Sequence, residues 1–286
     1  MATLDIGGSN MFYSESGAGK PVVLAHGIPT DFRAWNAQVP EFSKKYRTVA
    51  YSRRYASPNV REGDVSDSTV QNNADDLKKL IRALGPDPVS LVGHSYGGFV
   101  AAYLAANEPG LVRSLVLVEP AVSTMLVKNP NNPLELLALL LGSPAVASSV
   151  SGFRSKSLNP ALKALGEGRL DSSVELLSDG IQGEKASLGR LSEETQKMMK
   201  DNARTIAELK TAFPVFTKSD CARIKCRTLV LNGGQSPLWL RRIGFLLAGS
   251  IQGARAVSVR DAHHFPHIEN PGEFNSLVLG FLGEES

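Results

Sequence analysis

Short apolar runs alternate with amphipathic segments over the first part of the chain and again near its end. The runs predict buried strands at residues 21–25, 46–51, 89–92, 114–118, 228–231 and 255–259. Alternating apolar positions around Gly7-Gly8 predict a β-hairpin over residues 2–20. Helical patterns occupy 68–84, 99–106 and the segment that begins at Asn270-Pro271. Strands that alternate with helices predict an α/β fold, with a mostly parallel eight-stranded sheet and helices on both faces.

The strand–helix rhythm is interrupted between Ala121 and about Ile224, where the pattern is almost entirely helical. We therefore expect a core domain of residues 1–121 and 225–286, with residues 122–224 inserted as a helical cap. Ligands of open parallel sheets bind outside the carboxyl ends of the strands, so the cap is expected to cover that edge. The apolar residues of the insertion, which include the leucine-rich stretch Pro133 to Leu141, could line a pocket, but most of them are expected to pack its own helices together.

The segment 68–84 carries Val70, Ala74, Leu77, Ile81 and Leu84 on one helical face. A serine followed three residues later by a glutamine fits a capping box, which places the start of the helix at Ser68 with Gln71. Gly85 fits its end.

The stretch from Val89 to Ala106 is a predicted strand, a Gly-His-Ser-Tyr-Gly turn and a predicted helix. Gly93 and Gly97 allow a tight turn that pushes the Ser95 hydroxyl out at the end of the sheet. This G-x-S-x-G pattern in its strand–turn–helix context is typical of a nucleophile elbow. The alternative is a glycine-rich turn that holds an inert serine.

The five histidines fall in three segments, each at the end of a predicted strand, and the last segment is Asp261 to His267. With His26-Gly27, the elbow and the insertion, the tail His264-Phe265-Pro266-His267-Ile268-Glu269-Asn270-Pro271 resembles the α/β-hydrolase-fold enzymes that carry a cap domain. The resemblance implies that His264 is the general base for Ser95. His263 stands where the family often has glycine and is the alternative base.

The triad acid departs from the commonest family pattern, because the loop 232–237 contains no carboxylate. Glu119 lies 24 residues after Ser95, as the acid does in some haloalkane dehalogenases and lactone hydrolases that this arrangement resembles. Glu119 is therefore the expected acid, with Asp261 and Asp220 as weaker alternatives. The resemblance also implies an oxyanion hole made by the backbone N–H groups of Ile28 and Tyr96.

A serine nucleophile argues against haloalkane dehalogenase and epoxide hydrolase activity, which use aspartate in similar folds. It fits acyl transfer, so the expected function is hydrolysis of a small-molecule carboxylic ester or lactone through an acyl-enzyme. Cofactor-free perhydrolase or haloperoxidase activity would use the same triad, and a hydrolase-like ligand-binding protein is a third alternative.

The segment Ser52 to Asn59 stands where the family commonly has D-x-R-G-x-G-x-S, with Tyr55 in place of a glycine. Arg53 or Arg54 could bind an acidic substrate group, but a structural ion pair is the commoner use of such arginines.

The composition changes little in this picture. A net charge of +3 does not favour nucleic acid or a membrane surface as a partner. Cys221 and Cys226 have no second pair that would complete a metal site, and no cofactor is expected. The N-terminus does not resemble a signal peptide and no apolar run is long enough to span a bilayer. We therefore expect a cytoplasmic protein, either monomeric or homodimeric.

Overall fold

The computed structural model describes residues 2–5, 10–59, 65–129, 132–211 and 213–284. These residues contain an eight-stranded sheet in the order β1-β2-β4-β3-β5-β6-β7-β8. The pairs from β4 to β8 are parallel, and β1 and β2 are antiparallel at one edge. The strands are β1 (Ala2–Asp5), β2 (Asn10–Ser16), β3 (Pro21–Ala25), β4 (Arg47–Tyr51), β5 (Val89–His94), β6 (Val112–Val118), β7 (Arg227–Gly233) and β8 (Arg255–Val259). The Gly7-Gly8 turn of the predicted hairpin lies outside the described residues, but the predicted sheet is confirmed.

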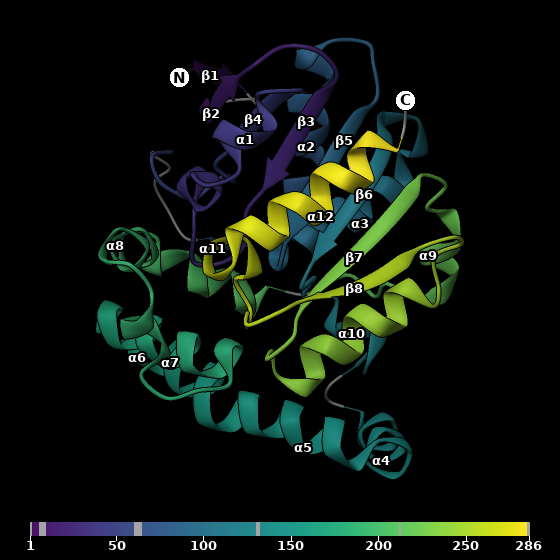
Figure 1. The fold of residues 1–286 in the computed structure, drawn as a ribbon. Helices are drawn as coiled ribbons and strands as arrows, with labels where there is room; N and C mark the ends of the chain where they lie inside the picture. The colour runs from purple at the N-terminus through teal and green to yellow at the C-terminus, as the bar shows by residue number, and fades with distance from the viewer. Residues whose placement is uncertain (1, 6–9, 60–64, 130–131, 212, 285–286) are drawn as a thin grey trace.

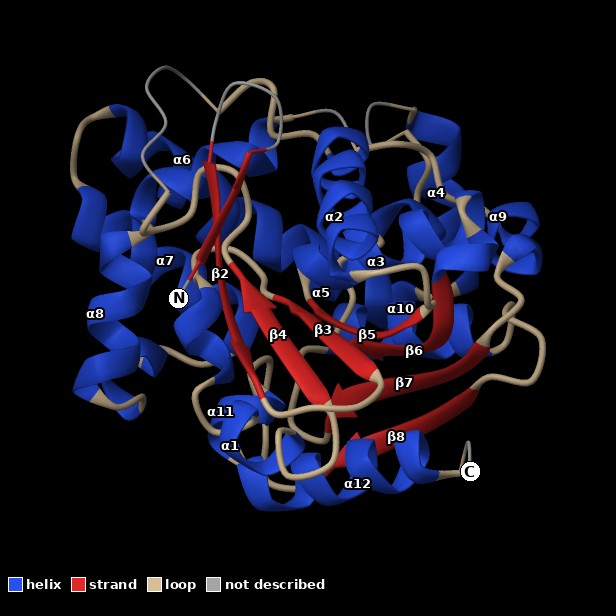
Figure 2. Ribbon diagram, turned by 90° about the horizontal axis from the view of Figure 1, so that it is seen from above, coloured by secondary structure: helices blue, strands red, loops and turns tan. Residues whose placement is uncertain are grey.

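Helices cover both faces of the sheet (Figure 2). Alternate strand residues point to opposite faces, so the apolar strands present buried side chains to the helices on each side. On one side, Val23, Leu91 and Leu115 pack with residues of α2 (Val70–Leu84), α3 (Tyr96–Asn107) and α10 (Leu238–Ala248). On the other side, Val22 and Val116 pack with residues of α1 (Val39–Phe42) and α12 (Pro271–Gly283). The central strands are therefore buried on both faces, which fixes the positions of their carboxyl ends.

Helix α2 begins one residue later than expected. Its N-cap is Thr69, whose hydroxyl accepts a hydrogen bond from the Asn72 N–H at 3.1 Å. The predicted capping box of Ser68 and Gln71 is wrong, because Ser68 is buried and its hydroxyl instead accepts from the Asn73 side chain. The predicted end at Gly85 is confirmed, with a φ of 141° that favours glycine.

Thr69→Ala should lower the free energy of unfolding by about 1 kcal/mol, because it removes the acceptor for the Asn72 N–H. Urea denaturation measures this change. Thr69→Ser retains the hydroxyl and should stay within about 0.5 kcal/mol of the wild-type value. Equal loss in both variants would contradict the capping role.

The segment between β6 and β7 is helical, and most of its helices lie beyond the carboxyl ends of the strands (Figure 1), whereas the last of them lies beside α3. A 3₁₀ segment, Ala203–Lys210, also belongs to it. Its α-helices are α4 (Pro133–Gly142), α5 (Pro144–Phe153), α6 (Asn159–Gly166), α7 (Leu170–Gln182), α8 (Glu193–Asp201) and α9 (Lys218–Arg223). The remaining helical segments of the described residues are η1 (Phe32–Trp35), η2 (Pro109–Leu111), η3 (Ser123–Met125), the π-helix η4 (Arg154–Leu158), η5 (Ser187–Arg190) and α11 (Pro266–Glu269).

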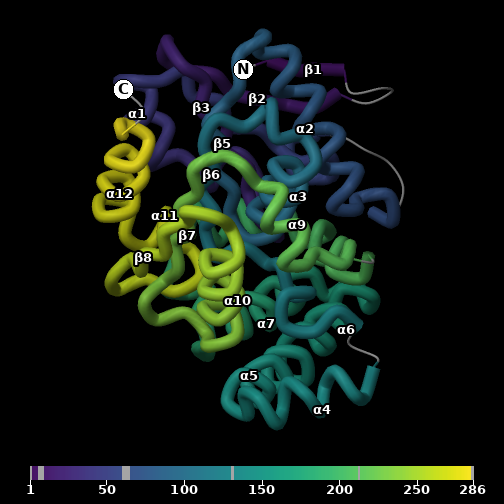
Figure 3. The backbone as a smooth tube through the Cα atoms, turned by 90° about the vertical axis from the view of Figure 1, so that its right-hand side faces the viewer, coloured from purple at the N-terminus to yellow at the C-terminus, as the bar shows by residue number. Residues whose placement is uncertain are grey.

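The leucines of α4 do not pack as expected. The side chains of Leu134, Leu136, Leu137, Leu140 and Leu141 are exposed, with Leu134 and Leu141 at 73% and 75%. Helix α4 lies at the outer end of the insertion beside α5 (Figure 3). It is apolar around most of its circumference, so one neighbour covers only part of its surface. No helix among the described residues has the length and apolar character needed to cross a membrane.

Candidate active site

The nucleophile candidate Ser95 sits on the sharp turn between β5 and α3. Its φ of 53° and ψ of −118° are unusual for a residue other than glycine. A Cβ at Gly97 would lie 2.4 Å from the Ala25 carbonyl oxygen, and one at Gly93 would lie 2.6 Å from the Gly97 carbonyl oxygen. Both glycines are therefore required for the close approach of α3 to β3 and β5, as the sequence predicted.

Parallel pairing places Ser95 and Glu119 next to one another. His94 and Val118 are register partners in β5 and β6, and each precedes one of the two residues. The Ser95 N–H donates to the Val118 carbonyl at 2.9 Å, and the Glu119 N–H donates to the Leu231 carbonyl at 2.8 Å. Glu119 lies 24 positions after Ser95 in the sequence, but the crossover between adjacent parallel strands brings the two residues together.

The His264 side chain lies between Ser95 and Glu119. Its Nε2 atom is 3.0 Å from Ser95 Oγ, and its Nδ1 atom is 3.3 Å from Glu119 Oε2. All three residues are buried, with Ser95 only 7% exposed. Glu119 Oε1 accepts the N–H of Gly233, the last residue of β7, at 2.7 Å, so the end of this strand supplies a donor to the carboxylate just before the loop where the family usually has the acid.

The alternative residues lie in other arrangements. Asp220 accepts from both the N–H and the hydroxyl of Thr217 at the start of α9. The His263 N–H donates to Glu269, and its Nδ1 atom is 3.6 Å from the same carboxylate. Asp261 lines, with His263 and Glu269, a cavity of about 320 Å³. None of the hydrogen bonds among the described residues links these three to Ser95.

Two side chains hold the backbone of His264. Its carbonyl lies 2.8 Å from His94 Nε2, and its N–H donates to Gln182 Oε1 at 2.8 Å. The Gln182 amide also donates to Glu269 at 2.6 Å. Gln182 ends α7 of the insertion and was missed in the sequence, because a glutamine on an amphipathic helix carries no signal for a partner 82 residues away.

Burial disfavours charge on the His264–Glu119 pair. It lowers the pKa of His264 to about 3 and raises the pKa of Glu119 to about 8. The Gly233 N–H and the Ser236 hydroxyl act in the opposite direction on Glu119, because they stabilise its carboxylate and lower its pKa. The imidazole is therefore neutral at pH 7 and able to accept a proton.

The predicted oxyanion-hole turn lies directly against Ser95. A Cβ at Gly27 would be 2.8 Å from Ser95 Cβ, so only glycine allows this approach. Ile28 and Tyr96 follow Gly27 and Ser95, and no hydrogen bond between described residues uses either backbone N–H. Both donors are thus left for a third group beside the serine.

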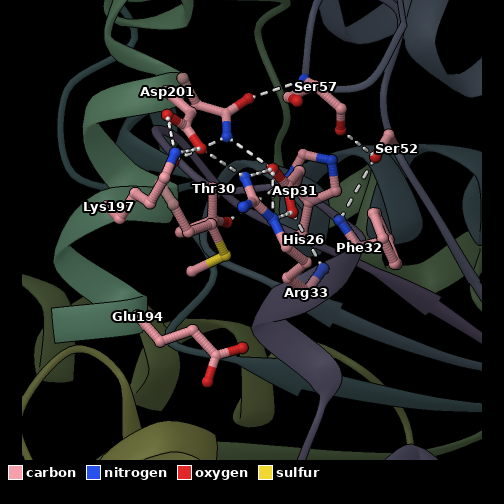
Figure 4. Close-up of polar contacts among 12 residues, drawn as sticks. His26, Thr30, Asp31, Phe32, Arg33, Ser52, Ser57, Glu194, Lys197 and Asp201 are labelled. Carbon is pink, nitrogen blue, oxygen red and sulfur yellow. Dashed lines mark hydrogen bonds and ion pairs between the residues drawn. The ribbon is translucent and has the colours of Figure 1, made fainter. Parts of the chain in front are cut away.

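A polar network fastens the insertion to the residues after this turn (Figure 4). Asp31 accepts from the Arg33 guanidinium at 2.7 Å and from the Asn202 amide at 2.7 Å. Arg33 also pairs with Asp201 at the end of α8, at 3.1 Å. The Ser57 N–H donates to Asn202 at 2.8 Å, so one asparagine of the insertion holds two loops of the core.

The two unusual arginines form structural ion pairs. Arg54 pairs with Asp67 and Asp76, each at 2.8 Å. Arg53 is buried and pairs with Glu208 of the Ala203–Lys210 segment at 2.5 Å. The ion-pair interpretation of both residues is therefore confirmed. Within the described part of the chain, no group of three or more His, Cys, Asp or Glu side chains is arranged to hold a metal ion.

The chain belongs to the alpha/beta hydrolase fold family, whose sequence profile matches residues 20–271. This match confirms the predicted family and fold class. The chain is 22% identical over 276 residues to (E)-2-((N-methylformamido)methylene)succinate hydrolase of Acinetobacter baylyi, an alignment that covers 94% of this chain and 93% of that protein.

Two further relatives differ in their chemistry. The chain is 35% identical over 128 residues to a non-heme chloroperoxidase of Kitasatospora aureofaciens, which covers 44% of this chain and 46% of the relative. The solved structure of Est816, an N-acyl homoserine lactone degrading enzyme, has a TM-score of 0.65 and 22% identity, over 98% of this chain and 100% of that one. Similarity at this level shows the fold, whereas the substrate depends on the site.

Proposed function

We propose that this protein is a serine hydrolase that cleaves a small-molecule carboxylic ester or lactone through an acyl-enzyme. The observation that carries the proposal is the continuous contact from Ser95 Oγ through the His264 ring to Glu119, with distances of 3.0 and 3.3 Å. Ser95 acts as the nucleophile, His264 as the general base and Glu119 as the acid that orients the imidazole and stabilises the imidazolium.

The reaction proceeds in two halves. Ser95 Oγ attacks the substrate carbonyl while His264 Nε2 takes its proton, and the oxyanion accepts hydrogen bonds from the N–H groups of Ile28 and Tyr96. His264 then gives the proton to the leaving alkoxide, and an ester forms between Ser95 and the acyl group. Water, deprotonated by His264, cleaves that ester and regenerates the serine.

The choice of serine decides the class of substrate. Attack of serine on an alkyl halide or epoxide carbon would form an ether, which the next water could not cleave. Attack on an acyl carbon forms an ester, which the same base can hydrolyse. The helices of residues 122–224 serve in this proposal as a cap over the site, since Gln182 of α7 contacts the His264 backbone.

Labelling with a fluorophosphonate probe tests the nucleophile without knowledge of the substrate. We expect stoichiometric modification of the wild type by intact mass and no modification of Ser95→Ala. A screen of esters and lactones then identifies the acyl group. A folded wild type that reacts with neither the probe nor any activated ester would favour the ligand-binding alternative.

Haloperoxidase activity is the second candidate, and the alignment with the chloroperoxidase favours it. An assay of monochlorodimedone halogenation with acetate, bromide and hydrogen peroxide separates the two. Peroxide-dependent halogenation far more efficient than ester hydrolysis would place this candidate first.

The pH dependence of kcat/KM follows from the buried pair. The active form has a Glu119 carboxylate and a neutral His264, and the pair titrates as a unit. Because burial raises the pKa of Glu119 to about 8, lowering the pH adds a proton to the pair and removes the active form. We expect kcat/KM for a p-nitrophenyl ester to rise through neutral pH and level off above about pH 8. A midpoint at or below 6.5, measured between pH 5 and 9.5, would contradict this assignment.

A further inference from the structure

The Arg53 guanidinium spans the oxyanion-hole turn and the insertion. Its Nε and Nη2 atoms donate to the carbonyls of His26 and Gly27 at 3.2 and 3.3 Å. Its Nη1 atom donates to Glu208 at 2.5 Å. Arg53 is 1% exposed, so these contacts form away from bulk water, where charge-assisted hydrogen bonds are strong.

The Gly27 carbonyl belongs to the same peptide group as the Ile28 N–H. This carbonyl also lies within hydrogen-bond distance of His26 Nδ1 at 2.8 Å and of the Thr30 hydroxyl at 3.2 Å. The backbone N–H of Arg53 donates to His26 Nε2 at 2.9 Å. The proton of the neutral imidazole must therefore lie on Nδ1, which donates to the Gly27 carbonyl. Donors that converge on one carbonyl polarise its peptide and make the attached N–H a better donor.

Arg53 also touches the residue that supplies the second N–H. Its guanidinium carbon lies 4.7 Å from the centre of the Tyr96 ring, a cation–π contact. The Tyr96 hydroxyl donates to the Ser68 carbonyl at 2.8 Å, so the side chain is held both through the face of its ring and through its hydroxyl. The Arg53 guanidinium therefore contacts both predicted donors: it binds the peptide group that carries the Ile28 N–H, and it lies over the ring of Tyr96.

We propose that Arg53, aligned by Glu208 of the insertion, is a positioning residue that orients and polarises the Gly27–Ile28 peptide for oxyanion binding. The proposal rests on the proposed function, since it requires an oxyanion beside Ser95. Arg53 stands at the variable second position of the D-x-R-G-x-G-x-S pattern, and Arg54 takes the place of its arginine. The bridge from Glu208 through Arg53 to the Gly27 carbonyl is thus a feature of this chain. It makes formation of the oxyanion hole depend on the packing of the insertion against the core.

Two variants at this ion pair separate positioning from stability. Arg53→Lys keeps a cation for Glu208 but lacks the planar fork that reaches two carbonyls. The double variant Arg53→Met/Glu208→Leu removes both buried charges together, which proteins often tolerate when apolar side chains of similar size replace them. The matched control is Arg54→Met/Asp76→Leu, which removes a neighbouring ion pair whose arginine donates to Asp76, Asp67 and the Asn72 carbonyl.

The readouts are the second-order rate of fluorophosphonate labelling, kcat and KM for p-nitrophenyl acetate, and the inhibition constant of a trifluoromethyl ketone. The phosphoryl oxygen of the probe and the hemiketal oxyanion of the ketone both occupy the oxyanion hole. We expect the double variant to lose about tenfold in kcat, in labelling rate and in ketone affinity, less than the 10²–10³ for removal of a donor itself, with KM within about twofold. Arg53→Lys should show a smaller loss with the same pattern, and the control should match the wild type.

The outcomes distinguish this inference from the proposed function. Wild type and both Arg53 variants labelled at equal rates would overturn the inference and leave the proposed function intact. A wild type that is not labelled would overturn both. If the double variant does not fold, Arg53→Lys decides, because a parallel loss in kcat and ketone affinity at constant KM supports positioning, and unchanged values overturn it.

Discussion

Ser95→Ala should lower kcat for ester hydrolysis by about 10⁶-fold, to a residual rate set by the other groups of the site. The variant lacks the hydroxyl that forms the acyl-enzyme in the proposed mechanism, and among the described residues no other hydroxyl hydrogen-bonds to His264 Nε2, which lies 3.0 Å from Ser95 Oγ. Initial rates with p-nitrophenyl acetate, measured after affinity purification from a strain without other esterases, give the value.

The fold of this variant should be retained, because alanine keeps the Cβ and the Ser95 N–H still donates to the Val118 carbonyl. Ser90→Ala provides a matched control within β5. Ser90 is buried and its hydroxyl accepts from Ser114 Oγ at 3.0 Å, so its loss affects stability by about 1 kcal/mol and leaves kcat unchanged. Turnover of Ser95→Ala above about one hundredth of the wild-type rate would exclude Ser95 as the nucleophile.

Glu119→Gln should lower kcat by about 10⁴-fold. The amide keeps the volume of the side chain and can still accept the Gly233 N–H, so the end of β7 should stay in place. It removes the negative charge opposite His264 Nδ1 and can present an NH₂ group there, which favours the wrong imidazole tautomer. The imidazolium that forms during attack then lacks a counter-charge in a buried site.

The controls for this prediction are the rival carboxylates. Asp261→Asn and Asp220→Asn should each keep kcat within about threefold of the wild type, because neither side chain contacts His264. Melting temperature confirms that the variants are folded. Near-normal turnover of Glu119→Gln together with a large loss in Asp261→Asn would transfer the role of the acid to Asp261.

The sequence by itself determined the elements that local patterns control. Apolar runs predicted the strands of the parallel sheet, and the glycines around Ser95 predicted a tight turn. The close backbone contacts of this turn leave no room for a Cβ. The helix start at Thr69 differed from the expected one at Ser68, because burial of the serine hydroxyl against Asn73 decides between adjacent candidates. The exposed leucines of α4 were likewise mispredicted, since composition does not say how many neighbours a helix has.

Only the tertiary structure decided which side chains meet. Register between β5 and β6 brings Glu119 beside Ser95, and the burial of Glu119 and His264, which the apolar runs do not report, shifts the pKa values of both ionisable side chains. The partners Gln182 and Glu208 come from the inserted helices, 82 and 155 residues from the groups that they hold. Local patterns report how each segment buries its own apolar face, whereas the hydrogen bonds of a site depend on the docking of distant segments.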